Sequence, residues 1–545
     1  MKNSSLKKTF IVFEIIIFIL FFVLFLSTFL HQITAFTQDL GRHLKIGEII
    51  IQTKKVPPTN LFSSSFPNFP FLNHHWLGEV IFYICFKFIG LNSLIFLKLG
   101  LCFLSFFSLV YLVYKKNGSL IAFLWGLVCF FLFSRRTEVR PEIFSFLFLS
   151  LYLIILSRKK YFNKFFFILP LIQVPWVNIH IYFFLGPSLI FFYFLNSLFK
   201  RNKIKKIFKK VIITTFLVGL ACFLNPNFSK GAFYPFNVFK NYGYKIVENQ
   251  SFFFMNRYFG KIADPYFLLV FFISLLSFIL TLKKQSFYSL VSFIFFSILG
   301  FQASRNLPLF GLASLFFVSQ NLNILKQGFL KKMSIQNLLN LKLGVFFGLI
   351  FLLIFLSLGN ITNQSRKRKY SYKKFGLGKF KGAEAGADFV IKNNLSGPLF
   401  NNFDIGSYLD FRFYPNIRVF VDSRPEAYPT SFFKSTYIPM QEKEEKWDEI
   451  NNLYNFNLIF FSHSDITPWA INFLSFIPKD PDWQIVFLDD FVIIFLKDNN
   501  LNKELIDRYS IKENDFQYNC RGQLDCYARM KRILNNLSWK VKLTL

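Results

Sequence analysis

Acidic residues are scarce in the first two thirds of this 545-residue chain, which makes each of them informative. Residues 1–360 carry 37 Lys and Arg residues against only eight Asp and Glu residues. A carboxylate near apolar membrane surface is costly, so several on one face predict either a functional site or solvated loop positions. The eight acidic residues are Glu14, Asp39, Glu48, Glu79, Glu138, Glu142, Glu248 and Asp264.

Asp39 directly follows the first long apolar run, where two interpretations are open. Its carboxylate could act as a general base that takes a proton from an acceptor hydroxyl. It could equally cap the free amides of a helix over residues 40–51. The two roles do not exclude each other, and we expect Asp39 to be the catalytic residue.

Cationic side chains at the ends of the predicted spans could bind a phosphate group. Arg can grip phosphate through two parallel hydrogen bonds, although such residues also serve as interfacial anchors. The candidates are Arg42, His74, His75, Arg140 and Arg305.

The composition excludes an ordinary soluble enzyme: 53% of the residues are hydrophobic and 17% are charged. The net charge of +33 is uneven, because residues 361–545 hold 26 Lys and Arg residues against 22 acids. The basic excess of residues 1–360 is typical of the short cytoplasmic loops that orient membrane spans. We therefore expect no nucleic-acid partner.

Apolar runs predict a polytopic α-helical membrane protein with about eleven spans. The loop charges place the N-terminus in the cytoplasm of a cell whose plasma membrane the chain crosses repeatedly. An odd number of spans then puts the C-terminal domain outside the cytoplasm. The runs are 9–30, 91–114, 119–134, 143–156, 165–179, 181–199, 208–224, 265–282, 286–303, 306–320 and 341–359.

The large first outer loop, residues 31–90, contains two segments with helical spacing of apolar residues. Residues 39–55 and 74–90 are predicted to lie as helices along the outer membrane surface. The proline-rich stretch between them predicts an extended loop, because proline stops helices.

After the spans, alternating elements predict a C-terminal α/β layered soluble domain. We expect helices over 383–393, 431–455 and 467–476, and strands over 399–401, 418–422, 457–462, 484–488 and 491–496. The predicted division is a membrane domain over 1–360, a basic linker over 361–382, the α/β domain over 383–500 and a helical tail over 501–545. No glycine-rich phosphate motif is present, and Cys520 and Cys526 could form either a disulfide or a reduced pair.

Several short segments together resemble bacterial proteins of the GT-C glycosyltransferase superfamily, related to protein mannosyltransferases and lipid A sugar transferases. The segments cover residues 39–48, 56–62, 73–79, 140–141, 176–180, 224–226, 305–306, 402–409 and 419–424. The resemblance implies a polyprenyl-phosphate-linked sugar donor, an extracytoplasmic acceptor that is a glycan, lipid or protein, and a catalytic acid at Asp39.

The same resemblance marks further polar residues as site candidates. In the membrane domain these are Glu48, Glu79, Asn178 and His180, and in the soluble domain Asp404, Tyr408, Asp422 and Arg424. The soluble-domain residues could form a lid that contacts acceptor or sugar, or Asp422 and Arg424 could be a strand-end ion pair. Relatives often carry paired acids where this chain has Gln38 and Asp39, so we expect no obligatory metal and no firm cofactor. A divalent cation could bind only if Glu48 or Glu79 reaches Asp39.

Three functions compete at this stage. The leading hypothesis is inverting transfer of a sugar in one displacement, with the lipid phosphate as leaving group. A transporter or flippase of a lipid-linked saccharide would place ionisable groups near the middle of the membrane, where Glu14 is the single acid. A non-catalytic envelope scaffold would depend on the surface of the soluble domain and not on the acids.

Overall fold

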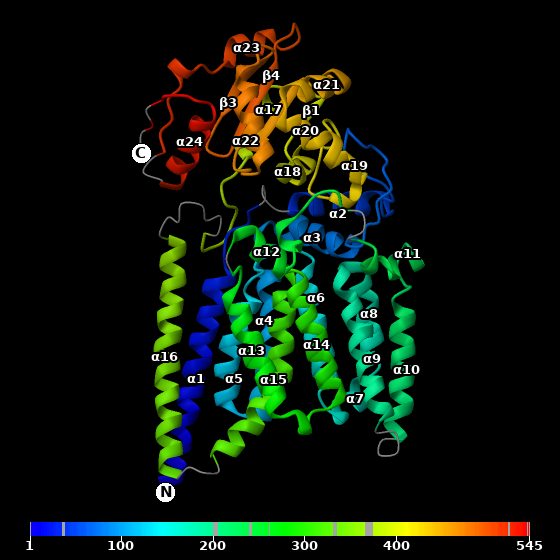
Figure 1. Cartoon of the computed structure of the whole chain (residues 1–545), viewed down its shortest axis with the longest axis vertical. Coiled ribbons are helices and arrows are strands. Elements are labelled where there is room, and N and C mark those ends of the chain that lie inside the picture. The colour runs from blue at the N-terminus through cyan, green and yellow to red at the C-terminus, as the bar shows by residue number, and fades with distance from the viewer. Residues whose placement is uncertain are drawn as a thin grey trace. The chain divides into compact units, whose positions relative to one another are not determined.

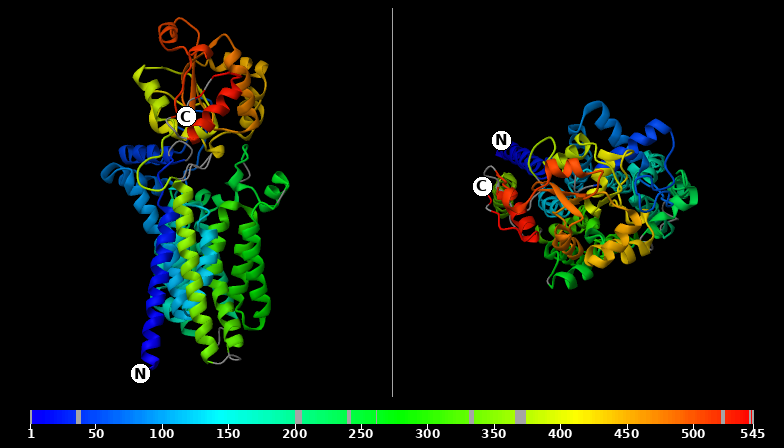
Figure 2. Two further views of the ribbon diagram at one scale, coloured as in Figure 1. Left: turned by 90° about the vertical axis from the view of Figure 1, so that its left-hand side faces the viewer. Right: turned by 90° about the horizontal axis from the view of Figure 1, so that it is seen from above.

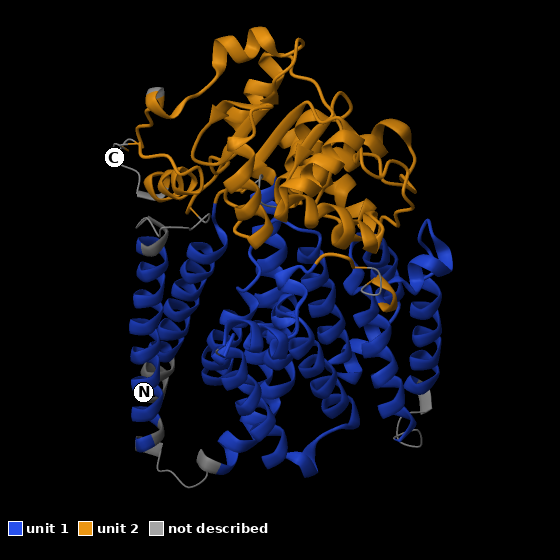
Figure 3. Ribbon diagram, turned by 45° about the horizontal axis from the view of Figure 1, so that its top comes forward, with its two compact units in different colours: residues 1–31, 94–235, 245–362 blue, residues 32–93, 236–244, 363–545 orange. Residues whose placement is uncertain are grey.

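The computed structural model describes residues 2–34, 39–199, 205–238, 242–260, 262–330, 335–365, 374–520, 524–541 and 543. The chain forms two compact units (Figure 3). Unit 1 comprises residues 1–31, 94–235 and 245–362, and unit 2 comprises residues 32–93, 236–244 and 363–545. The predicted division assigned residues 31–90 to the membrane domain, whereas the structure groups residues 32–93 with the C-terminal domain.

Unit 1 is a bundle of long apolar helices (Figure 1). Each of the eleven predicted apolar runs coincides with a helix or with a pair of consecutive helices. The main helices are α1 (Lys2–Phe29), α4 (Asn92–Asn117), α5 (Ser119–Phe133), α6 (Glu142–Leu156), α7 (Lys159–Phe165), α8 (Ile168–Ile179), α9 (Leu185–Leu198), α10 (Lys205–Ala221), α13 (Pro265–Leu280), α14 (Phe287–Gln302), α15 (Leu307–Leu330) and α16 (Ile335–Ser365). Shorter helices in the connections are η2 (Ile181–Phe184), α11 (Phe228–Ala232), η6 (Val247–Asn249), α12 (Phe252–Phe259), η7 (Leu282–Lys284) and η8 (Ser304–Asn306).

Among the described residues, five helical segments are long and apolar enough to cross a membrane, and α7 with α8 forms a sixth candidate bent by 73°. Four more apolar helices, α5, α6, α13 and α14, have 15 or 16 residues and are shorter than a full span. The chain is therefore a membrane protein. The eleven spans predicted from the apolar runs remain a prediction.

The first and last helices of unit 1, α1 and α16, lie side by side (Figures 1 and 2). The Phe10 and Phe346 rings meet edge to face at 6.1 Å. Glu14, the acid within α1, accepts a hydrogen bond from Tyr114 at 2.9 Å and faces the Lys342 ammonium at 3.7 Å. This half-buried acid therefore has partners that account for its presence inside a span.

Unit 2 contains a four-stranded sheet with the order β1-β2-β4-β3. Strand β1 (Leu399–Asn401) runs parallel to β2 (Leu458–Ser462), while β4 (Val492–Lys497) is antiparallel to β2 and to β3 (Trp483–Leu488). Every residue of β1 and β2 is buried, although β1 is an edge strand of the sheet and β2 a central one. The helices are α17 (Glu384–Lys392), α18 (Phe403–Phe413), α19 (Thr430–Phe432), α20 (Pro439–Glu442), α21 (Glu444–Tyr454), α22 (Pro468–Phe476), α23 (Lys503–Tyr509) and α24 (Leu524–Asn536).

The loop between α1 and α4 contributes two helices to unit 2. These are α2 (Leu40–Thr53) and α3 (Trp76–Ile89), which match the two predicted amphipathic segments. Helix α2 packs closely on α18, since a Cβ on Gly41 would lie 2.5 Å from the Ser407 carbonyl oxygen. Apolar residues of α2, including Ile46 and Ile50, share one buried core with the C-terminal sheet.

Two elements of the α/β domain differ from prediction. Residues 418–422 form no strand beyond a single bridge from Val419 to Ser63. The backbone there is bound by a side chain instead, because Asn401 accepts from the Phe420 amide and donates to the Val421 carbonyl. The predicted helix 431–455 is divided among α19, α20 and α21 with a π-helical turn at Phe433–Tyr437. Pro439 explains one of the breaks, because proline lacks the amide proton that helix continuation requires.

The tail carries a disulfide. Cys520 and Cys526 are bonded, which settles the alternative left open by their spacing. The four cysteines in or beside the apolar segments, Cys85, Cys102, Cys129 and Cys222, are free.

Candidate functional site

Three arginines gather around two glutamates at one end of unit 1. Arg136 lies between α5 and α6, and its Nε donates to Glu142 Oε1 at 2.7 Å. Glu248, on η6, accepts from Arg136 and from Arg140 Nη1, the latter at 2.9 Å. Arg305, on η8, donates to Asn249 Oδ1 at 2.9 Å and lies 3.8 Å from Glu142. We call these five charged side chains the arginine cluster.

The arginine cluster is cationic and partly open. Arg136 and Glu142 are almost completely buried, whereas the side chains of Arg140, Arg305 and Glu248 are 20%, 19% and 26% exposed. Burial acts to raise the pKa of Glu248, but the positive charges of Arg140, Arg136 and Arg305 together lower it to about 2. Three guanidinium groups therefore face two carboxylates, an arrangement that could attract an anion such as phosphate.

Two further candidates, Asn178 and His180, lie in unit 1 at the end of α8. The Asn178 amide donates to the Leu224 carbonyl at 2.8 Å, which ties α8 to the residues after α10. His180 Nδ1 lies 3.0 Å from Ser145 Oγ, and the ring packs on Tyr182. The Tyr182 hydroxyl donates in turn to Asn306 Oδ1 at 2.7 Å, next to Arg305. These residues link the arginine cluster to the helices around it.

Asp39 occupies the N-cap position of α2, but its side chain makes no capping hydrogen bond. The carboxylate instead accepts a hydrogen bond from the Ser423 hydroxyl. Ser423 also lies 2.5 Å from the Ser407 hydroxyl of α18. The half-buried carboxylate of Asp39 is therefore oriented by the α/β domain. The capping interpretation explains why Asp39 stands at the start of α2, but it does not explain the hydrogen bond with Ser423.

Helices α2 and α3 enclose a group of buried charged side chains, which we call the sealed cluster. Its members are Arg42, His43 and Glu79. Glu79 Oε1 accepts from His43 Nδ1 at 2.9 Å and from Arg42 Nη1 at 3.3 Å, and Oε2 accepts from Asn73 at 2.6 Å. The Glu79 side chain is fully buried, and those of Arg42 and His43 are 6% and 3% exposed.

The protonation of the sealed cluster follows from its contacts. Burial acts to raise the pKa of Glu79, but hydrogen bonds and charges from His43, Arg42 and Asn73 lower it, so Glu79 is ionised. Burial and the nearby Arg42 charge lower the pKa of His43 despite Glu79. The opposite charges of Arg42 and Glu79 neutralise each other in the protein interior, as is typical of a structural ion pair. This pairing leaves Arg42 little capacity to bind the phosphate headgroup of a lipid.

The remaining loop candidates lie near the sealed cluster. His75 is the N-cap residue of α3, its amide donates to Asn73 Oδ1, and its ring meets the His43 ring at 5.6 Å. His74 stacks against His75 at 3.8 Å between centroids. Glu48 pairs with Lys45 at 2.8 Å. Within the described ranges, no group of three or more His, Cys, Asp or Glu side chains could hold a metal ion.

Asp422 and Arg424 form a buried ion pair that also involves the loop between α1 and α4. Arg424 donates to Asp422 Oδ2 at 2.5 Å and to Asn60 Oδ1 at 2.8 Å, and its guanidinium lies 4.6 Å from the centre of the Phe71 ring. The contacts favour the ion-pair interpretation of these two residues. The pair secures the loop to the α/β domain, although it lies at the end of an irregular segment and not of a strand.

Asp404 and Tyr408 lie on α18 and do not share one environment. Tyr408 is buried and accepts a hydrogen bond from Arg412 Nη1 at 2.9 Å. The Asp404 side chain reaches the surface, although the surrounding protein and the negative charges of Asp465 and Asp39 raise its pKa. Asp404 thus belongs to the acidic surroundings of Asp39, while Tyr408 has a packing role.

Sequence reasoning missed several polar residues that the structure brings to these sites. Arg136 holds two glutamates of the arginine cluster, and Ser423 binds Asp39. Asp410 is fully buried with both oxygens unpaired within the described chain, and burial and the nearby Asp422 charge raise its pKa. Arg136 could have been found from its six-residue spacing to Glu142, but no local pattern marks Ser423 or Asp410.

Comparison with solved structures shows the fold. The oligosaccharyltransferase AglB of Archaeoglobus fulgidus, in complex with an inhibitory peptide and a dolichol-phosphate, aligns over 85% of this chain and 71% of its own at a TM-score of 0.53 and 11% identity. The same archaeal enzyme tethered to an acceptor peptide aligns over 88% of this chain and 74% of its own, at a TM-score of 0.54 and 11% identity. No protein-family model matches the sequence. No curated protein matches it. The chain therefore shares the fold of this archaeal oligosaccharyltransferase, which agrees with the fold that the sequence resemblance implied.

Proposed function

We propose that the chain is a membrane glycosyltransferase that moves a sugar from a polyprenyl-phosphate-linked donor to an acceptor outside the cytoplasm. The shared fold carries this proposal, because the archaeal enzyme with this fold has been solved with a dolichol-phosphate and with an acceptor peptide. Two features, one in each unit, are considered separately as candidates: the arginine cluster of unit 1 and the Asp39 carboxylate of unit 2.

The arginine cluster fits the role of phosphate binding. In an inverting displacement the acceptor oxygen bonds to the anomeric carbon while the bond from that carbon to the lipid phosphate breaks. The departing phosphate takes up the electron pair, and hydrogen bonds from charged donors stabilise it. Arg140 and Arg305 are the partly exposed members that would bind it. Arg136, locked by Glu142 and Glu248, would position them.

Asp39 fits the role of general base. The acceptor hydroxyl must lose its proton as its oxygen attacks, and a carboxylate within hydrogen-bond reach accepts that proton. The Ser423 hydroxyl holds one carboxylate oxygen of Asp39 in a defined orientation. Ser407 extends this hydrogen-bonded chain to α18 and so connects the base with the body of the α/β domain.

Replacing Asp39 by Asn tests the base directly. Purified full-length Asp39→Asn would be assayed with a panel of short-chain polyprenyl-phosphate hexoses, using envelope membranes from a strain deleted for the gene as acceptor. We expect transfer to fall by about 100-fold or more, because general-base catalysis contributes about that much. Glu48→Gln is the matched control, since Glu48 lies on the same helix and is paired with Lys45.

The outcomes of this assay separate the competing functions. Unchanged turnover of Asp39→Asn would reject Asp39 as the base. If the wild-type protein transfers no sugar but moves a labelled donor across vesicle membranes, the flippase hypothesis replaces the transferase. The structure offers that alternative little support, because Glu14 is already bound by Tyr114 and Lys342.

We further propose that the N-terminus is cytoplasmic and that unit 2 faces the outside of the plasma membrane. The Cys520–Cys526 disulfide supports this orientation, because disulfides persist in oxidising compartments. A membrane-impermeant label directed at an epitope after Leu545 should react in intact cells. If the epitope is labelled only after cell lysis, unit 2 lies in the cytoplasm and the proposed orientation is wrong.

A further inference from the structure

A polar pocket lies at the end of unit 1 opposite to the arginine cluster. Helix α6 begins at Glu142 of the cluster and ends at Leu156, which lines the pocket. Helix α14 runs in the reverse sense, from the pocket at its N-cap Ser286 toward Arg305 of the cluster. The pocket is therefore a separate site within the same helical bundle.

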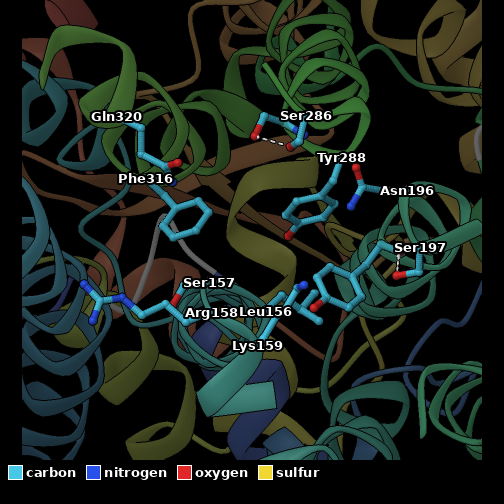
Figure 4. A pocket seen from close by; sticks show the side chains of 12 residues that line it. Leu156, Ser157, Arg158, Lys159, Asn196, Ser197, Ser286, Tyr288, Phe316 and Gln320 are labelled. Atoms are coloured by element: carbon cyan, nitrogen blue, oxygen red, sulfur yellow. Dashed lines mark hydrogen bonds between the residues drawn. The ribbon is translucent and has the colours of Figure 1, made fainter. Parts of the chain in front are cut away.

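The pocket has a volume of about 180 Å³ and a lining without acidic side chains. Because one water molecule takes about 30 Å³ of liquid, this space accepts a group of several heavy atoms. Figure 4 shows the Phe316 and Tyr288 rings on opposite sides, with the Tyr288 hydroxyl directed toward the middle. The lining consists of Leu156, Ser157, Arg158, Lys159, Tyr193, Asn196, Ser197, Ser286, Tyr288, Ser289, Phe316 and Gln320.

Two hydroxyl groups in this lining are buried without a partner among the described residues. They are Tyr288 Oη and Ser157 Oγ. Tyr288 is only 6% exposed, so water at the protein surface does not satisfy its hydroxyl. A buried polar group without a hydrogen bond costs about 1–3 kcal/mol, which indicates that a ligand or bound water completes the site.

Positive charge adjoins these hydroxyls. The half-buried Lys116 ammonium donates to the Ser157 carbonyl at 3.1 Å and lies 5.4 Å from the centre of the Phe316 ring, so it contacts two lining residues. Lys159 adds a second ammonium, whereas the Arg158 guanidinium points away from the pocket and packs on Tyr161 (Figure 4).

We propose that this pocket binds a phosphate group, held by the Lys159 ammonium and by the hydroxyls of Tyr288 and Ser157, while the Lys116 ammonium beside the lining residue Ser157 adds positive charge. Lysine binds phosphate as a point charge, and hydroxyl donors complete the oxygen contacts. The phosphate could come from the headgroup of an anionic phospholipid or from free phosphate in solution. The site is independent of the proposed transfer reaction, because it shares no residue with the arginine cluster or with Asp39.

The full-length protein in nanodiscs provides the test. One arm uses phosphatidylcholine discs with and without phosphatidylglycerol and counts retained phosphatidylglycerol by native mass spectrometry. The other arm adds inorganic phosphate to phosphatidylcholine discs and follows the melting temperature. Variants are Lys116→Gln and Tyr288→Phe. The matched control is Lys115→Gln, since Lys115 is adjacent and exposed and its ammonium packs on Tyr111 and Tyr114, which do not line the pocket.

We expect Lys116→Gln to weaken phosphate binding about tenfold and Tyr288→Phe about fivefold, while Lys115→Gln binds as the wild type does. Retention of phosphatidylglycerol would identify a lipid headgroup as the source, and stabilisation by inorganic phosphate would identify a free anion. If wild type and both pocket variants behave alike in both arms, the proposal is overturned. Tyr288→Phe removes a single oxygen, so it keeps the test decisive if Lys116→Gln fails to fold.

Discussion

The sealed cluster of unit 2 and the arginine cluster of unit 1 contain the same kinds of side chains and differ in access to solvent. Glu79 is fully buried beside Arg42, whereas Glu248 is 26% exposed beside Arg140. A closed ion pair stabilises the fold but has no room for substrate, while an open cluster can exchange one partner for a ligand. The comparison shows that solvent access, which residue type does not reveal, separates structural from functional charge.

The largest expected effect is on the sealed cluster. Replacing Glu79 by Ala leaves Arg42 buried without a counter-charge and removes a partner from Asn73. We expect the free energy of unfolding to fall by about 3–5 kcal/mol. Thermal unfolding of the detergent-solubilised protein measures the change, with Glu48→Gln as the control in a partly exposed pair. A loss no greater than that of the control would show that the cluster is not sealed.

A second prediction concerns acid stability of the arginine cluster. Because the folded pKa of Glu248, about 2, lies below the ordinary 4.5, its ionised form contributes stability above pH 4.5. That contribution, at most about 3 kcal/mol, should disappear as the pH falls from 4.5 toward 2. Melting temperatures of wild type and Glu248→Gln should differ at pH 6 and converge at low pH. A constant difference across this range would contradict the assignment.

A third prediction separates binding from folding in the arginine cluster. Arg140→Gln removes a partly exposed donor while Glu248 keeps its contacts with Arg136. We expect kcat/KM for the polyprenyl-phosphate donor to fall about tenfold with little change in melting temperature. Arg140→Lys should recover part of the loss, because it keeps the charge but not the planar fork. An unaltered kcat/KM in Arg140→Gln would remove Arg140 from the proposed phosphate site.

The smallest expected effect is on a surface ion pair. Arg412 and Asp388 lie 2.6 Å apart, and the Asp388 side chain is 53% exposed. Since exposed pairs contribute little, Asp388→Asn should change the free energy of unfolding by less than about 1 kcal/mol. Thermal unfolding in low and high salt measures the difference. A larger loss of unfolding free energy would mean that an ion pair with a short distance can stabilise the fold strongly even when it is exposed.

Much of the fold was predictable because its signals are local. Runs of apolar residues predicted the positions of the unit 1 helices, and their spacing predicted α2 and α3. Strands β1, β2, β3 and β4 were also expected close to their observed bounds. The predicted strand over 418–422 was wrong, because a distant side chain, Asn401, takes the hydrogen bonds that a neighbouring strand would have made.

The sequence predicted which types of residue the candidate site would contain, but not which of these residues would lie together. The scarcity of acids marked all eight acidic residues of positions 1–360, among them Asp39, Glu79 and Glu248, without showing which would be buried. Asp39 meets Ser423 across 384 positions of the sequence, and no local pattern contains that contact.

The sequence by itself determined that this is a helical membrane protein with an α/β domain, since apolar length and periodicity are properties of each segment. Only the tertiary structure decided that residues 32–93 fold with the C-terminal domain, and which charges are enclosed and which stay open. The physical reason is that burial and ion pairing depend on what packs against a side chain, and those neighbours come from distant parts of the chain.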